Sequence, residues 1–406
     1  MNLTQQEQEL LEGKYGEANR LAMEILVRVG EILGAKKLLK ISSAHVLGHY
    51  GSLHEAGIRV LEKFSSAGGR YRVPTTVDPA SVSLEGTDFE VPPEFAEAQR
   101  RLCTAHKAMG VIPSWSCTPY LYENIPKFGE NIAWAESSAV VFANSILGAR
   151  TDRMTMGLEV AASIVGRIPE FGLYIPENRV PTTLIEVDLQ NLTDLDFHSI
   201  GYLIGKQVKN QIPFLRGIPL WSSFDQLKTL GAAAASSGTV ALIHIEGISP
   251  EIKKGFIKVK KKKFSDKYEI GRAELKEVEE KLTTTAGEVD LVTLGCPHYS
   301  IEEMKALMEM VKGRKVSQKI PLWVYTSGYV KRYCEKKGYL KILEEAGVNV
   351  LTQTCMVISP LRYTGIRTIM TNSAKAANVI PSEHGIDVVY ASTQKCVETA
   401  ITGKRV

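Results

Sequence analysis

Three cysteines stand where a parallel α/β sheet would present its chemistry. Cys117 lies in SWSCTPY, Cys296 in LGCPHYS and Cys355 in TQTCMVI. Each comes after a short apolar or β-branched run that predicts a strand, at 111–113, 289–294 and 348–352. Open α/β sheets place ligands and catalytic groups at the carboxyl ends of their strands. The three thiols could therefore meet at one metal site, although they are far apart in the sequence.

The spacing of the cysteines disfavours a closed zinc site. Structural zinc sites usually carry paired C-x-x-C motifs, and this chain has none. Three thiolates on an iron-sulfur cluster instead leave one iron without a protein ligand, free to act as a Lewis acid in a dehydration. Buried free cysteines are also common in ordinary cores, so spacing alone leaves the packing interpretation open. The other three, Cys103, Cys334 and Cys396, lie in helix-like sequence and are interpreted as packing or surface residues.

Polar residues at other predicted strand ends form a second set of candidates. A loop containing Gly48 and His49 joins a predicted strand to a predicted helix, and free amides at a helix start attract phosphate or carboxylate. Thr76 and Asp78 close the next predicted strand. A glycine turn before a helix is more often only a turn, so the loop also fits a purely structural role.

The same two interpretations apply further along the chain. Ser137 and Ser138 stand at a predicted helix start, where hydroxyls either cap backbone amides or hold a substrate anion beside Arg150 or Arg153. Lys375 follows a predicted strand next to another helix start. It is the best local candidate for pairing with a substrate anion.

Composition and charge limit the class of protein. The 406 residues are 44% hydrophobic and 23% charged, which is typical of a folded globular chain of more than one unit. A formal charge of +4 does not indicate a nucleic-acid protein, and the basic run KVKKKK at 258–263 is interpreted as a solvated loop or a partner contact. The sequence shows neither a signal peptide nor an apolar stretch of about 20 residues, so we expect no membrane span. Six cysteines without a secretory signal favour a reducing compartment, and we expect a cytoplasmic protein.

Strands alternate with helices in the C-terminal part of the sequence, a pattern that predicts a parallel sheet covered by helices. The expected strands are 240–245, 289–294, 322–325, 348–352, 367–371 and 387–390, with helices at 301–312 and 330–345 among them. We expect three units: 1–65, with N-terminal helices and a first strand-loop-helix; 66–236, carrying Cys117; and 237–406, carrying Cys296 and Cys355.

Several of these motifs together resemble one known family. They are SSAH..G around His45 and Gly48, VPTT..PA around Thr76, SWSCTPY, ESSAVVFANSILGART, GCPHYS and the final TNSAK. Over nearly its whole length the chain resembles the large subunit of the aconitase X family, most closely its archaeal branch. The resemblance implies an α/β, aconitase-like fold of several α/β/α units with largely parallel sheets around a central cleft. It also implies a 4Fe-4S cluster bound by Cys117, Cys296 and Cys355. One iron of this cluster would be exposed and sensitive to oxygen, so the purified protein could contain a 3Fe-4S cluster or no cluster.

The resemblance further implies a partner and a reaction. A separate small subunit, a swivelling domain, would supply the catalytic serine, so the proton-abstracting base is not expected in this chain. The reaction in the archaeal branch is loss of water from (R)-5-phosphomevalonate, giving trans-anhydromevalonate 5-phosphate for isoprenoid biosynthesis by a mevalonate pathway. The phosphorylated substrate would contact Gly48, His49, Thr76, Asp78, Ser137, Ser138 and Lys375. The alternatives are a cis-3-hydroxy-L-proline dehydratase and an aconitase-like RNA-binding regulator, against which the modest net charge speaks.

Overall fold

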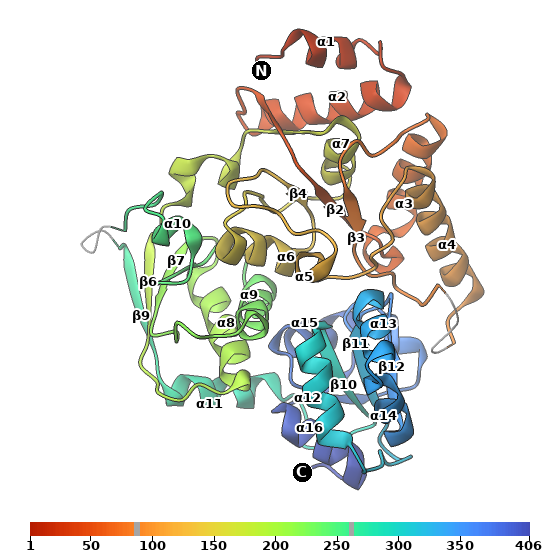
Figure 1. Cartoon of the computed structure of the whole chain (residues 1–406), viewed down its shortest axis with the longest axis vertical. Helices are drawn as coiled ribbons and strands as arrows, with labels where there is room; N and C mark the ends of the chain where they lie inside the picture. Colours follow the sequence, from red (N-terminus) through yellow and green to blue (C-terminus); the bar gives the residue numbers. More distant parts are fainter. Residues whose placement is uncertain (85–89, 260–263) are drawn as a thin grey trace.

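The computed structural model describes residues 1–84, 90–259 and 264–406. The end of the basic run at 258–263 therefore lies outside the described residues. The elements form three successive units that contain parallel sheets, with the first unit at the top and right of Figure 1, the second at the left and the third at the bottom. Among the described helices, none combines the length and the apolar character that crossing a membrane requires.

The first unit contains a parallel sheet in the order β3-β2-β4 and an antiparallel pair of β1 and β5. Its strands are β1 (Leu38–Lys40), β2 (Ala44–Val46), β3 (Thr75–Val77), β4 (Ala133–Trp134) and β5 (Arg167–Pro169). Its helices are α1 (Gln5–Leu11), α2 (Glu17–Ile32), α3 (Tyr50–Ser66), α4 (Pro93–Ala108), α5 (Pro119–Tyr122), α6 (Ser137–Phe142), the π turn η1 (Ala143–Leu147) and α7 (Leu158–Val165). The strand expected at 111–113 is reduced to a single parallel bridge between Ile112 and Thr76.

The second unit is a four-stranded parallel sheet in the order β8-β7-β6-β9, with helices packed on it. The strands are β6 (Thr183–Val187), β7 (Pro213–Arg216), β8 (His244–Ile245) and β9 (Asp266–Ile270); the helices are α8 (Asp194–Val208), α9 (Phe224–Ser237), α10 (Pro250–Lys253) and α11 (Arg272–Leu282). The short turns η2 (Gly172–Tyr174) and η3 (Pro176–Arg179) lead into it. Helices α8 and α9 begin at capping boxes, in which Thr193 and Ser223 each bond the third helical residue.

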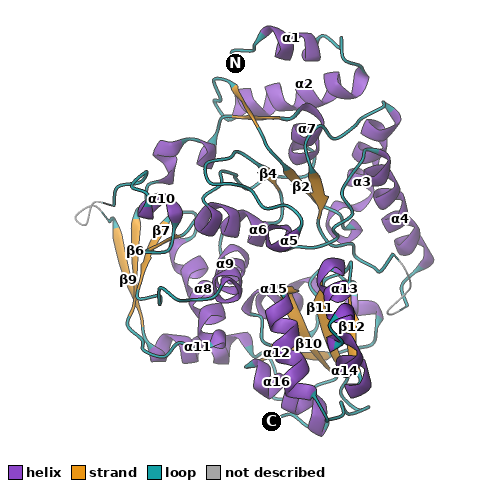
Figure 2. Ribbon diagram, viewed as in Figure 1, coloured by secondary structure: helices purple, strands orange, loops and turns teal. Residues whose placement is uncertain are grey.

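The third unit is the parallel sheet that the C-terminal alternation predicts, in the order β12-β11-β10-β13-β14. Figure 2 shows helices on its faces. The strands are β10 (Leu291–Tyr299), β11 (Leu322–Thr326), β12 (Val348–Leu351), β13 (Thr368–Thr371) and β14 (Asp387–Tyr390); the helices are α12 (Ile301–Val311), α13 (Gly328–Lys336), α14 (Tyr339–Ala346), α15 (Ala374–His384) and α16 (Thr393–Thr402), with the turn η4 (Leu361–Tyr363). The α/β class with largely parallel sheets is confirmed.

Two details of the C-terminal prediction are wrong. The helix expected at 330–345 is two helices, α13 and α14, because Gly338 takes a φ of 77° in the left-handed region and ends the first helix. The strand expected at 240–245 forms only as the short β8, and it pairs with β7 in the second unit rather than with the third unit's sheet.

The sheets do not follow the expected division into 1–65, 66–236 and 237–406. The first unit's sheet pairs β2 with β3 and β4 across residue 65, and the second unit's sheet pairs β7 with β8 across residue 237. Strand pairing between distant segments is a long-range property that local composition does not reveal.

Candidate metal and substrate site

The three candidate cysteines come from two units and lie close together. Cys117 precedes α5 in the first unit, Cys296 lies within β10, and Cys355 follows β12. All three are buried. The thiol of Cys355 donates a hydrogen bond to Cys296, and the backbone N–H of His298 donates to the sulfur of Cys117 at 3.4 Å. Cys117 therefore lies near the β10 segment that carries Cys296, and the charges of Cys296 and Cys117 both act on Cys355.

Backbone irregularities place the two third-unit cysteines. The pairing of β10 with β11 shifts register between Leu294 and Tyr299, so Cys296 lies inside a strand at a point where the ladder is interrupted. The preceding Gly295 has a φ of 95°, and a Cβ there would lie 2.2 Å from the carbonyl oxygen of Tyr325. Near Cys355, the N–H of Ala80 donates to the carbonyl of Gln353 at 2.7 Å, which joins the first unit to the third. The site thus forms where these two units meet.

The thiols differ in how readily they lose a proton. Burial, with the carboxylates of Glu136 and Asp78 nearby, raises the pKa of Cys117 well above its usual value. The hydrogen bond from Cys355 and the positive charge of Lys375 lower the pKa of Cys296. The same sulfur pairing and burial raise the pKa of Cys355 well above the usual range. Of the three thiols, Cys296 therefore loses its proton most readily.

The donor set fits an iron-sulfur cluster better than a single ion. Within residues 1–84, 90–259 and 264–406, no three His, Cys, Asp or Glu side chains converge tightly enough to hold one metal ion. A cluster does not need that convergence, because each thiolate binds a different iron. Burial opposes deprotonation of the thiols. Binding of a positively charged metal group favours it, because the thiols release their protons when they bind metal.

A buried ion pair crosses the site from the first unit to the third. The ammonium of Lys375, in α15, lies 2.6 Å from the Glu136 carboxylate, and both side chains are largely buried. Burial alone would lower the pKa of Lys375, but Glu136 and the nearby Cys296 and Cys117 raise it above its ordinary value. The lysine is therefore a fixed cation beside the thiols. The hydroxyl and N–H of Ser138 bond the same carboxylate at 2.7 and 3.1 Å.

The serines do not have the capping role that the sequence indicates. Glu136 is the N-cap of α6, and its carboxylate accepts the bonds of Ser138. Ser137 is the first residue of α6 and only partly buried. Arg153 lies against Asp152, 3.7 Å away, and donates to the Thr239 carbonyl, so its guanidinium is held by groups other than these serines.

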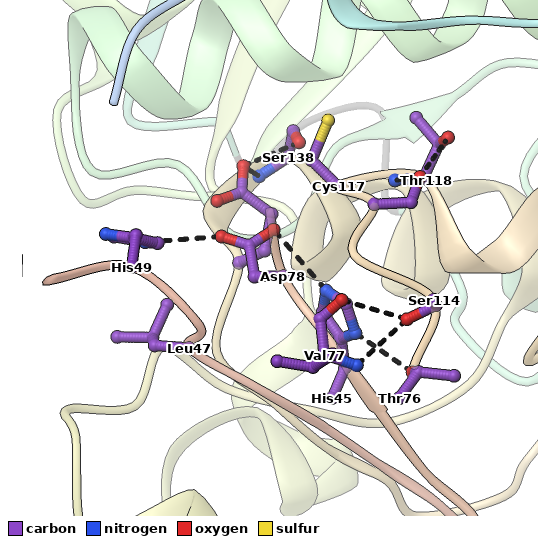
Figure 3. A network of polar contacts seen from close by, with 12 residues as sticks. His45, Leu47, His49, Thr76, Val77, Asp78, Ser114, Cys117, Thr118 and Ser138 are labelled. Carbon is purple, nitrogen blue, oxygen red and sulfur yellow. Dashed lines mark hydrogen bonds and ion pairs between the residues drawn. The ribbon is translucent and has the colours of Figure 1, made fainter. Parts of the chain in front are cut away.

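A buried carboxylate between two histidines forms the first unit's side of the site (Figure 3). The Nε2 atoms of His45 and His49 lie 3.5 and 3.3 Å from the two oxygens of Asp78. Burial alone would raise the pKa of Asp78, but its contacts with the two imidazoles hold it well below the usual range. Thr76, whose hydroxyl lies 2.9 Å from Nδ1 of His45, orients that imidazole.

A buried glutamine, not identifiable from the sequence, pins the loop at Gly48. The Gln99 amide donates to the carbonyl of Gly48 at 2.8 Å and accepts from the N–H groups of Tyr50 and Ser81 at 3.0 and 2.9 Å. No local signal marks it, because a glutamine in an amphipathic helix ordinarily faces water.

Glu136, His45 and His298 also complete the site without having been chosen as site residues. Burial lowers the pKa of His298 to about 4, so its ring is neutral. Its Nε2 donates to the Thr354 carbonyl at 2.8 Å, which leaves Nδ1 to accept from Ser116 at 3.2 Å. These residues belong to the motifs SSAH, ESSAVV and GCPHYS. Most of the residues that they contact in the site lie elsewhere in the sequence, so the motifs alone do not reveal their roles.

Comparison with known proteins identifies the family. Models of the first, second and third domains of aconitase X match residues 1–177, 181–280 and 289–402. The solved structure of Thermococcus kodakaraensis aconitase X in its holo form superposes with a TM-score of 0.90 at 36% identity, covering 98% of this chain and 100% of that one. The chain belongs to the aconitase X family.

Two groups of characterised relatives span almost the whole chain. It is 40% identical to the phosphomevalonate dehydratase large subunit of Methanocaldococcus jannaschii, over 98% of this chain and 100% of the relative. The large subunit of Methanothermobacter thermautotrophicus is 38% identical, with 96% coverage of each chain. The cis-3-hydroxy-L-proline dehydratase of Pseudomonas aeruginosa is 36% identical over 98% of this chain, but the match covers 70% of that protein.

A side chain at Gly48 should destabilise the site. A Cβ there would lie 2.4 Å from the Asp78 carbonyl oxygen and 2.7 Å from the Val77 side chain, so Gly48→Ala forces the two strands apart. We expect a loss of about 1–3 kcal/mol of stability, measured as a lower thermal unfolding midpoint. Gly51→Ala is the matched control, because its Cβ would meet only the Ser81 hydroxyl, 3.2 Å away, and a more distant carbonyl. Equal midpoints for the two variants would contradict this interpretation.

Proposed function

We propose that this chain is the large subunit of an iron-sulfur hydro-lyase that removes water from (R)-5-phosphomevalonate, giving trans-anhydromevalonate 5-phosphate for isoprenoid biosynthesis. The observation that carries the proposal is the identity of 40% and 38% to phosphomevalonate dehydratase large subunits over nearly the full length of both chains. The names of these relatives imply a small subunit, and the proposed enzyme is active only with that partner.

The proposed cofactor is a 4Fe-4S cluster held by Cys117, Cys296 and Cys355. Three buried thiols support this assignment: Cys296 and Cys355 shift each other's pKa, and Cys117 accepts from the N–H of His298, two residues after Cys296. Cys103 lies in the first unit's apolar core, and Cys334 and Cys396 both lie in the third unit's, which supports their interpretation as packing residues. A cluster bound by three thiolates supplies one iron without a protein ligand, which favours departure of a hydroxyl group.

The proposed substrate contacts surround the thiols on the first and third units. Lys375 provides a fixed positive charge for a carboxylate or phosphate, and Glu136 with Ser138 keeps its ammonium in place. The Gly48–His49 loop and Thr76 frame the opposite side, where Asp78 holds the imidazole of His49. In this scheme these residues, with Ser137, bind and orient the substrate, and the group that abstracts the proton comes from the small subunit.

The cluster assignment has a direct spectroscopic test. Anaerobically purified protein is expected to show broad visible absorption with stoichiometric iron and sulfide. Serine at Cys117, Cys296 or Cys355 should abolish this absorption, because each change removes one of three thiolate ligands. Cys396→Ser and Cys334→Ser are matched controls, since both thiols are buried in the third unit's core away from the site. Retention of an intact cluster in all three ligand variants would refute the assignment.

Replacing Lys375 should lower activity more than stability, provided that its partner Glu136 is neutralised in the same variant. The double variant Lys375→Met/Glu136→Gln removes both members of the 2.6 Å pair, so no uncompensated charge stays buried. A lost charged hydrogen bond to the substrate, about 1.5–3 kcal/mol, should lower kcat/KM about 10–100-fold. Lys341→Gln, at an exposed lysine of α14, is the control. Unchanged kcat/KM in the folded double variant would remove Lys375 from the substrate site.

Substrate specificity distinguishes the proposed phosphomevalonate dehydratase from its nearest alternative, a cis-3-hydroxy-L-proline dehydratase. The chain, reconstituted anaerobically with the small subunit of the same organism, is supplied with (R)-5-phosphomevalonate or cis-3-hydroxy-L-proline. We expect mass spectrometry to detect loss of one water from the phosphorylated compound only. Dehydration of the hydroxyproline alone would replace the proposed reaction with that of the Pseudomonas aeruginosa relative.

A further inference from the structure

Three large apolar side chains are exposed where the loop after β7 enters α9. Leu220, Trp221 and Phe224 have 69%, 86% and 57% of their surface accessible. Single exposed apolar residues are ordinary, but a tryptophan, a phenylalanine and a leucine within five positions form a patch that usually marks a binding surface.

A series of side-chain contacts links this patch to the other two units. The Asp225 carboxylate, next to Phe224, accepts a hydrogen bond from the Ser300 hydroxyl at 2.8 Å. The following residue, Ile301, donates its N–H to the Tyr122 hydroxyl at 3.1 Å, and Tyr122 stacks on Tyr329 with ring centroids 4.8 Å apart. Tyr329 is itself exposed, as is Ile125 just after Tyr122. We call Leu220, Trp221, Phe224, Ile125 and Tyr329 the rim surface.

Aromatic contacts lead from the rim surface to the buried thiols. The ring of Phe224 meets Phe142 edge-on at 5.6 Å, and Phe142 stacks on Tyr120 at 4.1 Å. Tyr120 is buried and lies three residues after Cys117. A chain that covers the rim surface would thus lie beside the candidate site.

We infer that the rim surface is where the small subunit docks, with Trp221 and Tyr329 as its main contacts. This inference rests on the proposed function, which requires a second chain to bring a catalytic group to the thiols. A partner on the rim surface is positioned to do so, because that surface is contributed by all three units and adjoins the site. The match to the cis-3-hydroxy-L-proline dehydratase of Pseudomonas aeruginosa covers 70% of that protein, so it has additional chain that could serve as a covering domain. Exposed tryptophan and tyrosine are also the residues that most often dominate binding energy at protein interfaces.

The test measures affinity rather than activity. Trp221→Ser and Tyr329→Ser are titrated with the purified small subunit by calorimetry, and each is expected to weaken binding at least about 10-fold. Ile32→Ser is the matched control: Ile32 is 83% exposed at the end of α2, in the first unit and outside the rim surface, and its replacement should leave the affinity unchanged. Because all three side chains are exposed, equal thermal midpoints should show that folding is intact.

Each contrary result has a distinct meaning. Wild-type affinity in both rim variants, or no binding of the small subunit to the wild-type chain, would overturn the inference. So would sedimentation showing that the chain alone forms a dimer that Trp221→Ser dissociates, because the rim surface would then join two copies of this chain. If the small subunit binds in a Trp221-dependent way but the complex does not dehydrate (R)-5-phosphomevalonate, the docking surface stands and the proposed reaction fails.

Discussion

The buried pair of Lys375 and Glu136 is the interaction on which the site depends. Neither charge could stay in the interior alone, since removing one member of a buried pair costs about 3–5 kcal/mol. The pair spans 239 positions of sequence and fixes the start of α15 in the third unit against the start of α6 in the first. It therefore sets the distance between the two surfaces that carry the thiols, and the ammonium it holds is the main positive charge that the thiols experience.

The electrostatics of the thiols favour occupancy by a cation. Burial and two carboxylates work against ionisation of Cys117, and the neighbouring Cys296 and burial work against ionisation of Cys355. Lys375 supplies only one positive charge against three potential thiolates and Glu136. A cluster whose irons bind the sulfurs would relieve this imbalance, because binding and thiol deprotonation are coupled. The residues of the site are thus better suited to holding a cofactor than to reacting as free thiols.

Local patterns in the sequence are sufficient to predict the sheet of the third unit, but they do not predict how residues of different units assemble into the site. The strands at 322–325 and 387–390 have the apolar runs of a buried parallel sheet, and both form as predicted because that pattern matches their burial on two faces. That sheet also explains why Cys296 and Cys355 could be expected at one edge. Cys117 comes from another unit, so its position after a predicted strand left its convergence with them open, and only the resemblance to a known family assigned all three to one cluster.

The roles of the other site residues could not be predicted, because those roles depend on contacts between residues far apart in the sequence. Asp78 was chosen as a polar residue at a strand end, yet the two imidazoles that keep it ionised come from either side of Gly48. Gln99 looked like an ordinary helix residue, although three backbone groups depend on its amide. The serines at 137 and 138 were placed at a helix start correctly, but the cap is the neighbouring glutamate, which uses its carboxylate for both the helix and Lys375.

The second unit supplies none of the proposed ligands or substrate contacts, yet it supports both sides of the site. From α9, the buried Lys228 donates to the carbonyl of His298 at 3.1 Å and pairs with Glu303 at the start of α12. Its positive charge is stable there because Asp225 and Glu303 raise its pKa, against the effect of burial. At the start of the same helix, Phe224 packs against Phe142 at the end of α6. One helix of the second unit therefore contacts the strand that carries Cys296 and the helix capped by Glu136, so a shift of this unit would move Cys296 and Glu136 together.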